Sequence, residues 1–127
     1  MLRSLLTASL LLALSLPALA GVMPFPAAFH TQDITVDGVK IHVRVGGKGP
    51  AVVMLHGFGD TGDMWAPLAA DLAKDHTVVV PDLRGLGLSS IPDGGYDKKT
   101  QAGDIRGVLA ALGIEHAVVI GLSLIHI

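Results

Sequence analysis

Three short apolar runs, at 51–55, 76–80 and 117–120, constrain the fold of this 127-residue chain more than any other feature. Each run is rich in valine and lacks the strict alternation that marks a half-exposed strand. Strands covered on both faces, as in a parallel sheet, have this pattern. The stretches between the runs are long enough to hold a helix each, so the sequence predicts three buried parallel strands.

Two amphipathic helices are expected between these strands. The first has Asp63 as its expected N-cap, and its apolar face follows the spacing i, i+3, i+4, i+7. That face consists of Trp65, Leu68, Ala69 and Leu72. The second begins near Asp97 and ends with Gly113 at the C′ position. Its apolar face consists of Ala102, Ile105, Val108, Leu109 and Leu112.

An antiparallel hairpin is predicted before the first buried strand. The Asp-Gly pair at 37–38 favours a tight turn between the segments 31–36 and 39–45, and the second of these alternates apolar and polar residues. Its polar face, expected to contact solvent, carries Lys40, His42 and Arg44. A hairpin followed by strand, helix, strand, helix and strand predicts an α/β fold, with a parallel sheet and an antiparallel edge.

The N-terminal residues have the three-part pattern of a secretory signal. A positive residue, Arg3, precedes the uncharged Leu-rich run 5–16, and the small residues of Ala18-Leu19-Ala20 mark a cleavage site before Gly21. The run is shorter than the roughly 20 residues that span a bilayer, so we expect an exported, periplasmic or secreted protein without a stable membrane anchor. Residues 21–30 are interpreted as a linker.

The amino-acid composition narrows the range of possible binding partners. Nine Lys plus Arg against eleven Asp plus Glu give a net charge of −2, with no basic stripe for nucleic acid. Cysteine is absent, and no histidine has a partner at metal-ligand spacing, so we expect no metal and no cofactor. A small-molecule substrate is the partner that remains.

Ligands of such a sheet bind beyond the carboxyl ends of its strands. The loops at those ends are 56–59, 82–89 and the residues from Gly121 onward. Taken alone, each of these loops could have a purely structural role. A single histidine such as His56, for example, is more often structural than catalytic. The pair Gly85-x-Gly87 lacks the third glycine of a dinucleotide cradle. Their combination and order carry the functional signal.

Together these loops resemble the α/β-hydrolase family over 33–121. His56-Gly57-Phe58 is similar to the family's oxyanion loop, the segment 82–89 to its Asp-x-Arg-Gly-x-Gly-x-Ser signature, and 118–121 to the approach to its nucleophile elbow. The resemblance implies the N-terminal half of an α/β-hydrolase sheet, a partial domain over 31–121 truncated at the elbow.

The resemblance also implies roles by position. The backbone N–H of Phe58 and that of position 124 would form the oxyanion hole, which stabilises charge on a tetrahedral intermediate. Gly57 and Gly59 would permit a close backbone approach. The side chains of His56 and Asp82 would brace the loops, and Arg84 would tie its turn to neighbouring carbonyls. Gly121 would open the elbow.

Ser123 occupies the nucleophile position. The loop 81–90 and the segment 95–100 look most like the epoxide hydrolase and haloalkane or haloacid dehalogenase branch, in which an aspartate stands at the position equivalent to 123. A carboxylate displaces an epoxide oxygen or halide at an sp³ carbon, whereas a serine alkoxide suits an ester carbonyl. Two alternatives stay open: a serine esterase or lipase-like hydrolase, and a non-catalytic pseudoenzyme or binding remnant.

The last six residues depart from the family pattern, because Ile125 stands where the elbow needs a small residue. The transposase mosaic-end sequence CTGTCTCTTATACACATC translates to Leu-Ser-Leu-Ile-His-Ile, which is the segment 122–127. We therefore expect 122–127 to be sequencing-adapter read-through and the catalytic acid and histidine to lie outside this chain. The fragment itself is expected to be inactive. An in-frame stop directly after the Ile127 codon in untagged genomic DNA would contradict this interpretation.

Overall fold

The computed structural model describes residues 24–122, so the expected signal peptide at 1–20 and the nucleophile position Ser123 lie outside the described residues. The elements in chain order are β1 (His30–Val36), β2 (Val39–Gly46), β3 (Ala51–Leu55), the 3-10 helix η1 (Gly62–Trp65), α1 (Ala66–Leu72), β4 (Thr77–Pro81), α2 (Lys98–Ala111) and β5 (Ala117–Gly121). Over the range 24–122, no helix combines the length and apolar character needed to cross a membrane.

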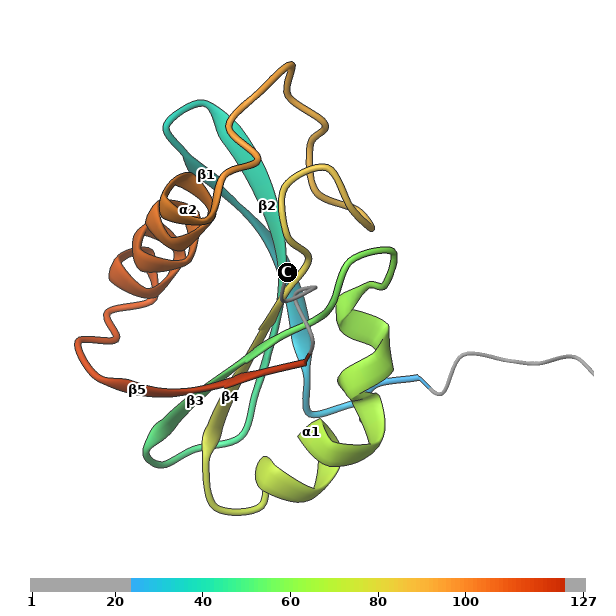
Figure 1. Cartoon of the computed structure of the whole chain (residues 1–127). Coiled ribbons are helices and arrows are strands. Elements are labelled where there is room, and N and C mark those ends of the chain that lie inside the picture. The colour runs from blue at the N-terminus through green and yellow to red at the C-terminus, as the bar shows by residue number, and fades with distance from the viewer. Residues whose placement is uncertain (1–23, 123–127) are drawn as a thin grey trace, which may run out of the picture.

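The five strands form one mixed sheet in the order β1-β2-β4-β3-β5 (Figure 1). β1 and β2 are an antiparallel hairpin, and β2 also pairs antiparallel with β4. β3 pairs in parallel with β4 on one side and with β5 on the other. The predicted fold class is therefore confirmed: an antiparallel hairpin joined to a parallel β-α-β-α-β unit.

The sheet lies between two helical layers, with α2 on one face and η1 with α1 on the other (Figure 1). Successive side chains of a strand point to opposite faces, so the valine-rich runs supply both cores. Val53 and Val79 pack in the cluster that contains Ile105 of α2. Val52 and Val78 pack in the cluster that contains Trp65, and this double coverage explains why these strands read as continuously apolar.

The helix ends follow local capping chemistry. The side chain of Asp97 accepts a hydrogen bond from the Thr100 N–H at 3.0 Å, as predicted for the start of α2. Gly113 follows the helix at a φ of +70°, in agreement with the predicted C′ glycine. The prediction for the first helix is off by two residues: Thr61 is the N-cap of η1, and Asp63 lies in the first turn.

The third predicted strand forms as β5, but the described chain does not cover both of its faces. Val118 is 62% exposed and Val119 is 59% exposed. β5 is at the edge of the sheet, and among the described residues β3 is its only paired strand. An apolar run predicts burial, but the described residues leave both valines more than half exposed.

The expected solvent contact of the polar face of β2 is also only partly correct. Lys40 is exposed, whereas Arg44 is only 5% exposed. The Phe25 ring lies 5.4 Å from the Arg44 guanidinium carbon, and the η1 residue Asp63 pairs with Arg44 at 2.8 Å. The alternation of residues along β2 correctly identified its polar face. It carried no information on the segments that cover the end of this strand.

Candidate active site

The residues that follow β3 and β4 lie at the same end of the parallel strands as Leu122, which follows β5. Leu55, the last residue of β3, is the partner of Gly121, the last residue of β5. The Leu122 N–H extends this pairing with a hydrogen bond of 3.1 Å to the Leu55 carbonyl. The described chain therefore ends beside the residues that open the β3–η1 loop, residues 57–61.

His56 joins the beginning of the β3–η1 loop to the end of β4. The Leu83 N–H donates to His56 Nε2 at 2.9 Å, so this nitrogen is an acceptor and the ring proton lies on Nδ1. His56 Nδ1 then donates to the Gly57 carbonyl at 2.9 Å. The ring is fully buried, and both of its nitrogens are used in these contacts. This geometry suits a brace between two loops.

Phe58 lies at the tip of the β3–η1 loop with 78% of its surface exposed. The loop folds back through a hydrogen bond from the Asp60 N–H to the Gly57 carbonyl. Within residues 24–122, no hydrogen bond engages the Phe58 N–H. Gly59 has a φ of +77°, and a Cβ there would meet no atom within 4 Å. Its backbone conformation, rather than crowding by described neighbours, calls for glycine.

Asp82 joins the end of the same loop to the end of β4. Its Oδ1 accepts from the Gly62 N–H at 2.7 Å and from Arg44 Nη1 at 2.9 Å, and its Oδ2 accepts from the Leu88 N–H at 2.9 Å. Burial of this carboxyl opposes ionisation, but the two backbone amides and the guanidinium outweigh it and hold the pKa of Asp82 below its usual value. A fully buried carboxylate thus organises two loops at once.

Arg44 and Asp63 were not among the candidate site residues from the sequence. Arg44 bridges two carboxylates, because its Nη1 contacts Asp82 and its Nη2 contacts Asp63. No local motif indicates this role, since the three residues come from β2, η1 and the residue after β4. The only hint in the sequence was Asp82, the first residue of the signature, because a buried carboxylate needs a cation beside it.

Arg84 is tied mainly to a carboxylate rather than to carbonyls. Its Nε and Nη2 donate to the two oxygens of Asp104 on α2, each at 2.6 Å, while its Nη1 donates to the Gly94 carbonyl at 3.2 Å. Hydrogen bonding to Asp104 outweighs burial and raises the pKa of Arg84. The contact to a carbonyl agrees with the prediction from the sequence. The bidentate pair with Asp104 was not predicted, because only the apolar residues of this helix were used to assign its buried face.

Two glycines of the signature are required by close contacts. A Cβ on Gly85 would lie 2.6 Å from Tyr96 Cε1, and one on Gly87 would overlap the Asp82 carboxylate. Both residues also have positive φ, +79° and +54°. Gly87 lets the following Leu88 N–H reach Asp82 Oδ2.

We expect Gly87→Ala to lower the free energy of unfolding of the natural full-length protein by roughly 1–3 kcal/mol, because alanine is strained at this φ and would displace Asp82. Chemical denaturation followed by circular dichroism measures the change. Gly94→Ala is the matched control, since a Cβ there meets nothing within 4 Å. Equal stability of the two variants would contradict this account of Gly87.

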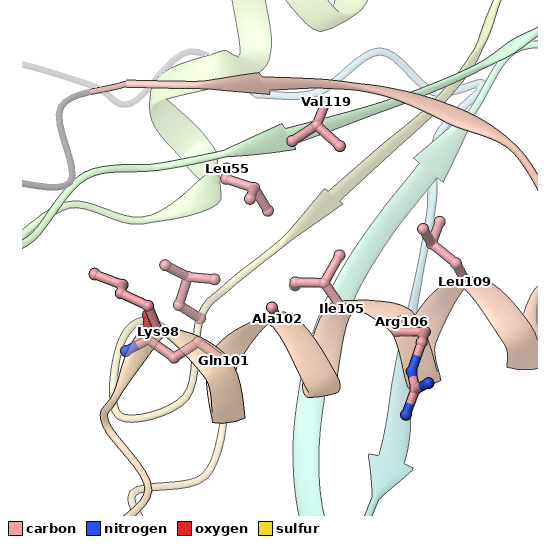
Figure 2. Close-up of a pocket in the computed structure, with 9 residues that line it drawn as sticks. Leu55, Lys98, Gln101, Ala102, Ile105, Arg106, Leu109 and Val119 are labelled. Atoms are coloured by element: carbon pink, nitrogen blue, oxygen red, sulfur yellow. The ribbon is translucent and has the colours of Figure 1, made fainter.

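A separate apolar hollow of about 390 Å³ lies between α2, the end of β3 and the middle of β5 (Figure 2). Leu55, Ile105, Leu109 and Val119 point into it. None of the described candidate site residues lines it. Over the described range, no group of three or more His, Cys, Asp or Glu side chains is placed to hold a metal ion.

Comparison with known proteins gives a consistent set of matches. A family model described as alpha/beta hydrolase fold matches residues 50–124. The soluble epoxide hydrolase of Corynebacterium sp. strain C12 is 40% identical over 86 residues, which is 68% of this chain and 30% of that protein. The fluoroacetate dehalogenase of a Burkholderia species is 41% identical over 98 residues, which is 73% of this chain and 32% of that protein.

A solved structure agrees with these matches. The ligand-free epoxide hydrolase CorEH superposes with a TM-score of 0.72 at 36% identity, over 73% of this chain and 33% of that one. The chain spans about a third of the length of the two curated relatives.

Proposed function

Because the chain belongs to the alpha/beta hydrolase fold family, we propose that its full-length parent is an exported hydrolase that opens an epoxide or cleaves a carbon–halogen bond. The family assignment confirms the resemblance found in the sequence. Two relatives at 40% and 41% identity, an epoxide hydrolase and a fluoroacetate dehalogenase, support the choice of reaction. Both reactions displace a leaving group from an sp³ carbon of a small molecule.

The observation that carries the proposal is the β3–η1 loop at the sheet edge where β5 ends. The Phe58 N–H has no partner within the described range, and it belongs to residues 56–58, which resemble the family's oxyanion loop and lie within the stretch that the family model matches. In the proposed reaction, an aspartate at position 123 attacks the carbon. A carbon–halogen bond then breaks with release of halide, or an epoxide carbon–oxygen bond breaks and the ring oxygen takes up a proton to become a hydroxyl group. The result is an alkyl-enzyme ester. Water then adds to the ester carbonyl, and collapse of the oxyanion releases the alcohol and regenerates the carboxylate.

The oxyanion in the second step would be held by the N–H groups of Phe58 and position 124. The histidine that activates water and its acidic partner would come from the remainder of the parent protein. The reaction needs only a nucleophile, water, a general base and an oxyanion hole, so no metal or organic cofactor enters it.

A single turnover in heavy-oxygen water tests the proposal on the full-length protein, with an aryl epoxide, fluoroacetate and an aryl ester as substrates. An aspartate nucleophile predicts turnover of the epoxide or of fluoroacetate. It also predicts an unlabelled first product and heavy oxygen in the enzyme's carboxylate. Turnover of the ester alone, with label in the released acid, would refute the proposal.

Ser123 in the printed sequence is the observation that favours the second candidate, a serine esterase or lipase-like hydrolase. Serine at this codon in untagged genomic DNA would support it, and aspartate would support the first candidate. A residue incapable of nucleophilic attack, in a parent without a downstream histidine, would indicate a pseudoenzyme or binding protein.

A further inference from the structure

We propose that Arg44 is a positioning residue for the oxyanion donor at Phe58, acting through the end of the β3–η1 loop. The inference rests on the proposed hydrolase function, but it applies to an aspartate and to a serine nucleophile alike. In either case the loop must hold the Phe58 N–H where negative charge develops. Arg44 does not contact the reacting atoms in this scheme; it fixes the loop that does.

The β3–η1 loop is held at both ends by consecutive residues at the end of β4. Its beginning is held by His56, which joins the Leu83 N–H to the Gly57 carbonyl. Its end is held by Asp82, which accepts from the Gly62 N–H at 2.7 Å. Phe58 lies between these two anchors, so a shift of either anchor moves the donor.

Arg44 acts on the second anchor in two ways. Its Nη1 pairs with the same Asp82 oxygen that accepts from Gly62, and its Nη2 pairs with Asp63 at 2.8 Å. Asp63 lies in η1, directly after the loop. One guanidinium therefore holds the loop end directly through Asp63 and indirectly through Asp82. Lysine has no planar fork with which to reach both carboxylates at once.

The space around Arg44 leaves little freedom for an alternative arrangement. A Cβ on Gly62 would lie 2.7 Å from Arg44 Nη1 and 3.0 Å from Asp82 Oδ1, so the backbone of η1 is in direct contact with the ion pair. The Phe25 ring also packs against the guanidinium, with its centroid 5.4 Å from the guanidinium carbon. In such a dry site, charged hydrogen bonds are strong and their geometry is well defined.

Kinetics on the full-length enzyme separate positioning from stability. We expect Arg44→Gln and Arg44→Lys to lower kcat about tenfold, because a small displacement of a catalytic group is costly. Where only the second step is slowed, KM should fall in proportion and kcat/KM should change little. With an aspartate nucleophile the oxyanion hole serves the second step. The alkyl-enzyme ester should therefore accumulate, and intact-mass spectrometry detects it. A purely structural role would reduce the amount of active enzyme without accumulation of the ester.

Two further measurements keep the proposal testable if Arg44→Gln folds poorly or the substrate class differs. Asp63→Ala removes the direct arm, together with a hydrogen bond of 3.3 Å from the Thr61 hydroxyl, but it leaves the Arg44–Asp82 pair in place and should give a smaller fall in kcat. Amide hydrogen exchange of residues 57–61 should be faster in each variant, whichever substrate the wild type turns over. Lys48→Gln, at an exposed position in the β2–β3 turn, is the control and should match the wild type.

Unchanged kcat and unchanged amide exchange in folded Arg44→Gln or Arg44→Lys would overturn the role of Arg44. If the enzyme hydrolyses an ester but neither an epoxide nor an organohalide, the proposed reaction is refuted. The kcat of the Arg44 variants would then still be compared with that of the wild type on the ester. The two failures are thus distinguishable.

Discussion

Replacing Asp82 with asparagine is expected to lower the free energy of unfolding of the full-length protein by about 3–5 kcal/mol, because it removes one partner of a buried ion pair. Arg44 would keep only Asp63, whose side chain is partly exposed. An asparagine amide would also present N–H groups toward one of the two backbone N–H donors that Asp82 now accepts. Urea denaturation at neutral pH measures the loss.

Asp93→Asn is the matched control, since it removes an exposed carboxylate and should change stability by less than about 0.5 kcal/mol. The pH dependence provides a second test. The folded pKa of Asp82 lies below the ordinary value of 3.8, so its stabilising contribution is complete above that value and is lost as the pH falls through the folded pKa. The stability difference between wild type and Asp82→Asn should therefore narrow below a pH of 3.8. A constant difference would contradict the assigned ionised state.

A polypeptide of residues 21–122 expressed alone is expected to be insoluble or only partly folded, and to show no hydrolase activity. Its β5 edge exposes Val118 and Val119, and an apolar edge strand with unpaired backbone groups promotes association between chains. Centrifugation of the lysate and gel filtration of the soluble fraction measure the outcome. Soluble monomer with turnover would contradict the prediction.

Charge on this edge should relieve the association. The variant Val118→Lys with Val119→Lys is expected to raise the soluble fraction severalfold, because lysine on an edge strand disfavours pairing with a second chain. Thr35→Lys is the control on β1, the opposite edge of the sheet, where Thr35 is already a polar, exposed residue. If both substitutions improve solubility equally, the apolar β5 edge is not the cause.

Much of the fold follows from local pattern. The strand periods, the Asp-Gly turn, the Asp97 cap and Gly113 all act within a few residues, and each is confirmed. The order of His-Gly-Phe, the glycine-rich signature and the third strand was enough to identify the family. The oxyanion role of Phe58 and the nucleophile at 123 stay predictions.

The local pattern failed where distant segments meet. It did not indicate that Arg44 would be buried, and it missed Asp104 as the partner of Arg84. It also did not foretell that β4 would lie between β2 and β3. Burial of a polar side chain depends on what packs over it, and that information is spread along the chain.

The sequence by itself therefore determined most of the helices and strands and the class of fold, and it singled out the loops proposed to carry the chemistry, because backbone propensity and apolar periodicity are local. Only the tertiary structure decided how those loops are held. Asp82 and Leu83 anchor the two ends of the β3–η1 loop, and Arg44 joins the far anchor from a strand about 40 residues earlier in the chain. These contacts are long-range pairings of buried charge and backbone amides, and they exist only once the sheet has brought their strands to one edge.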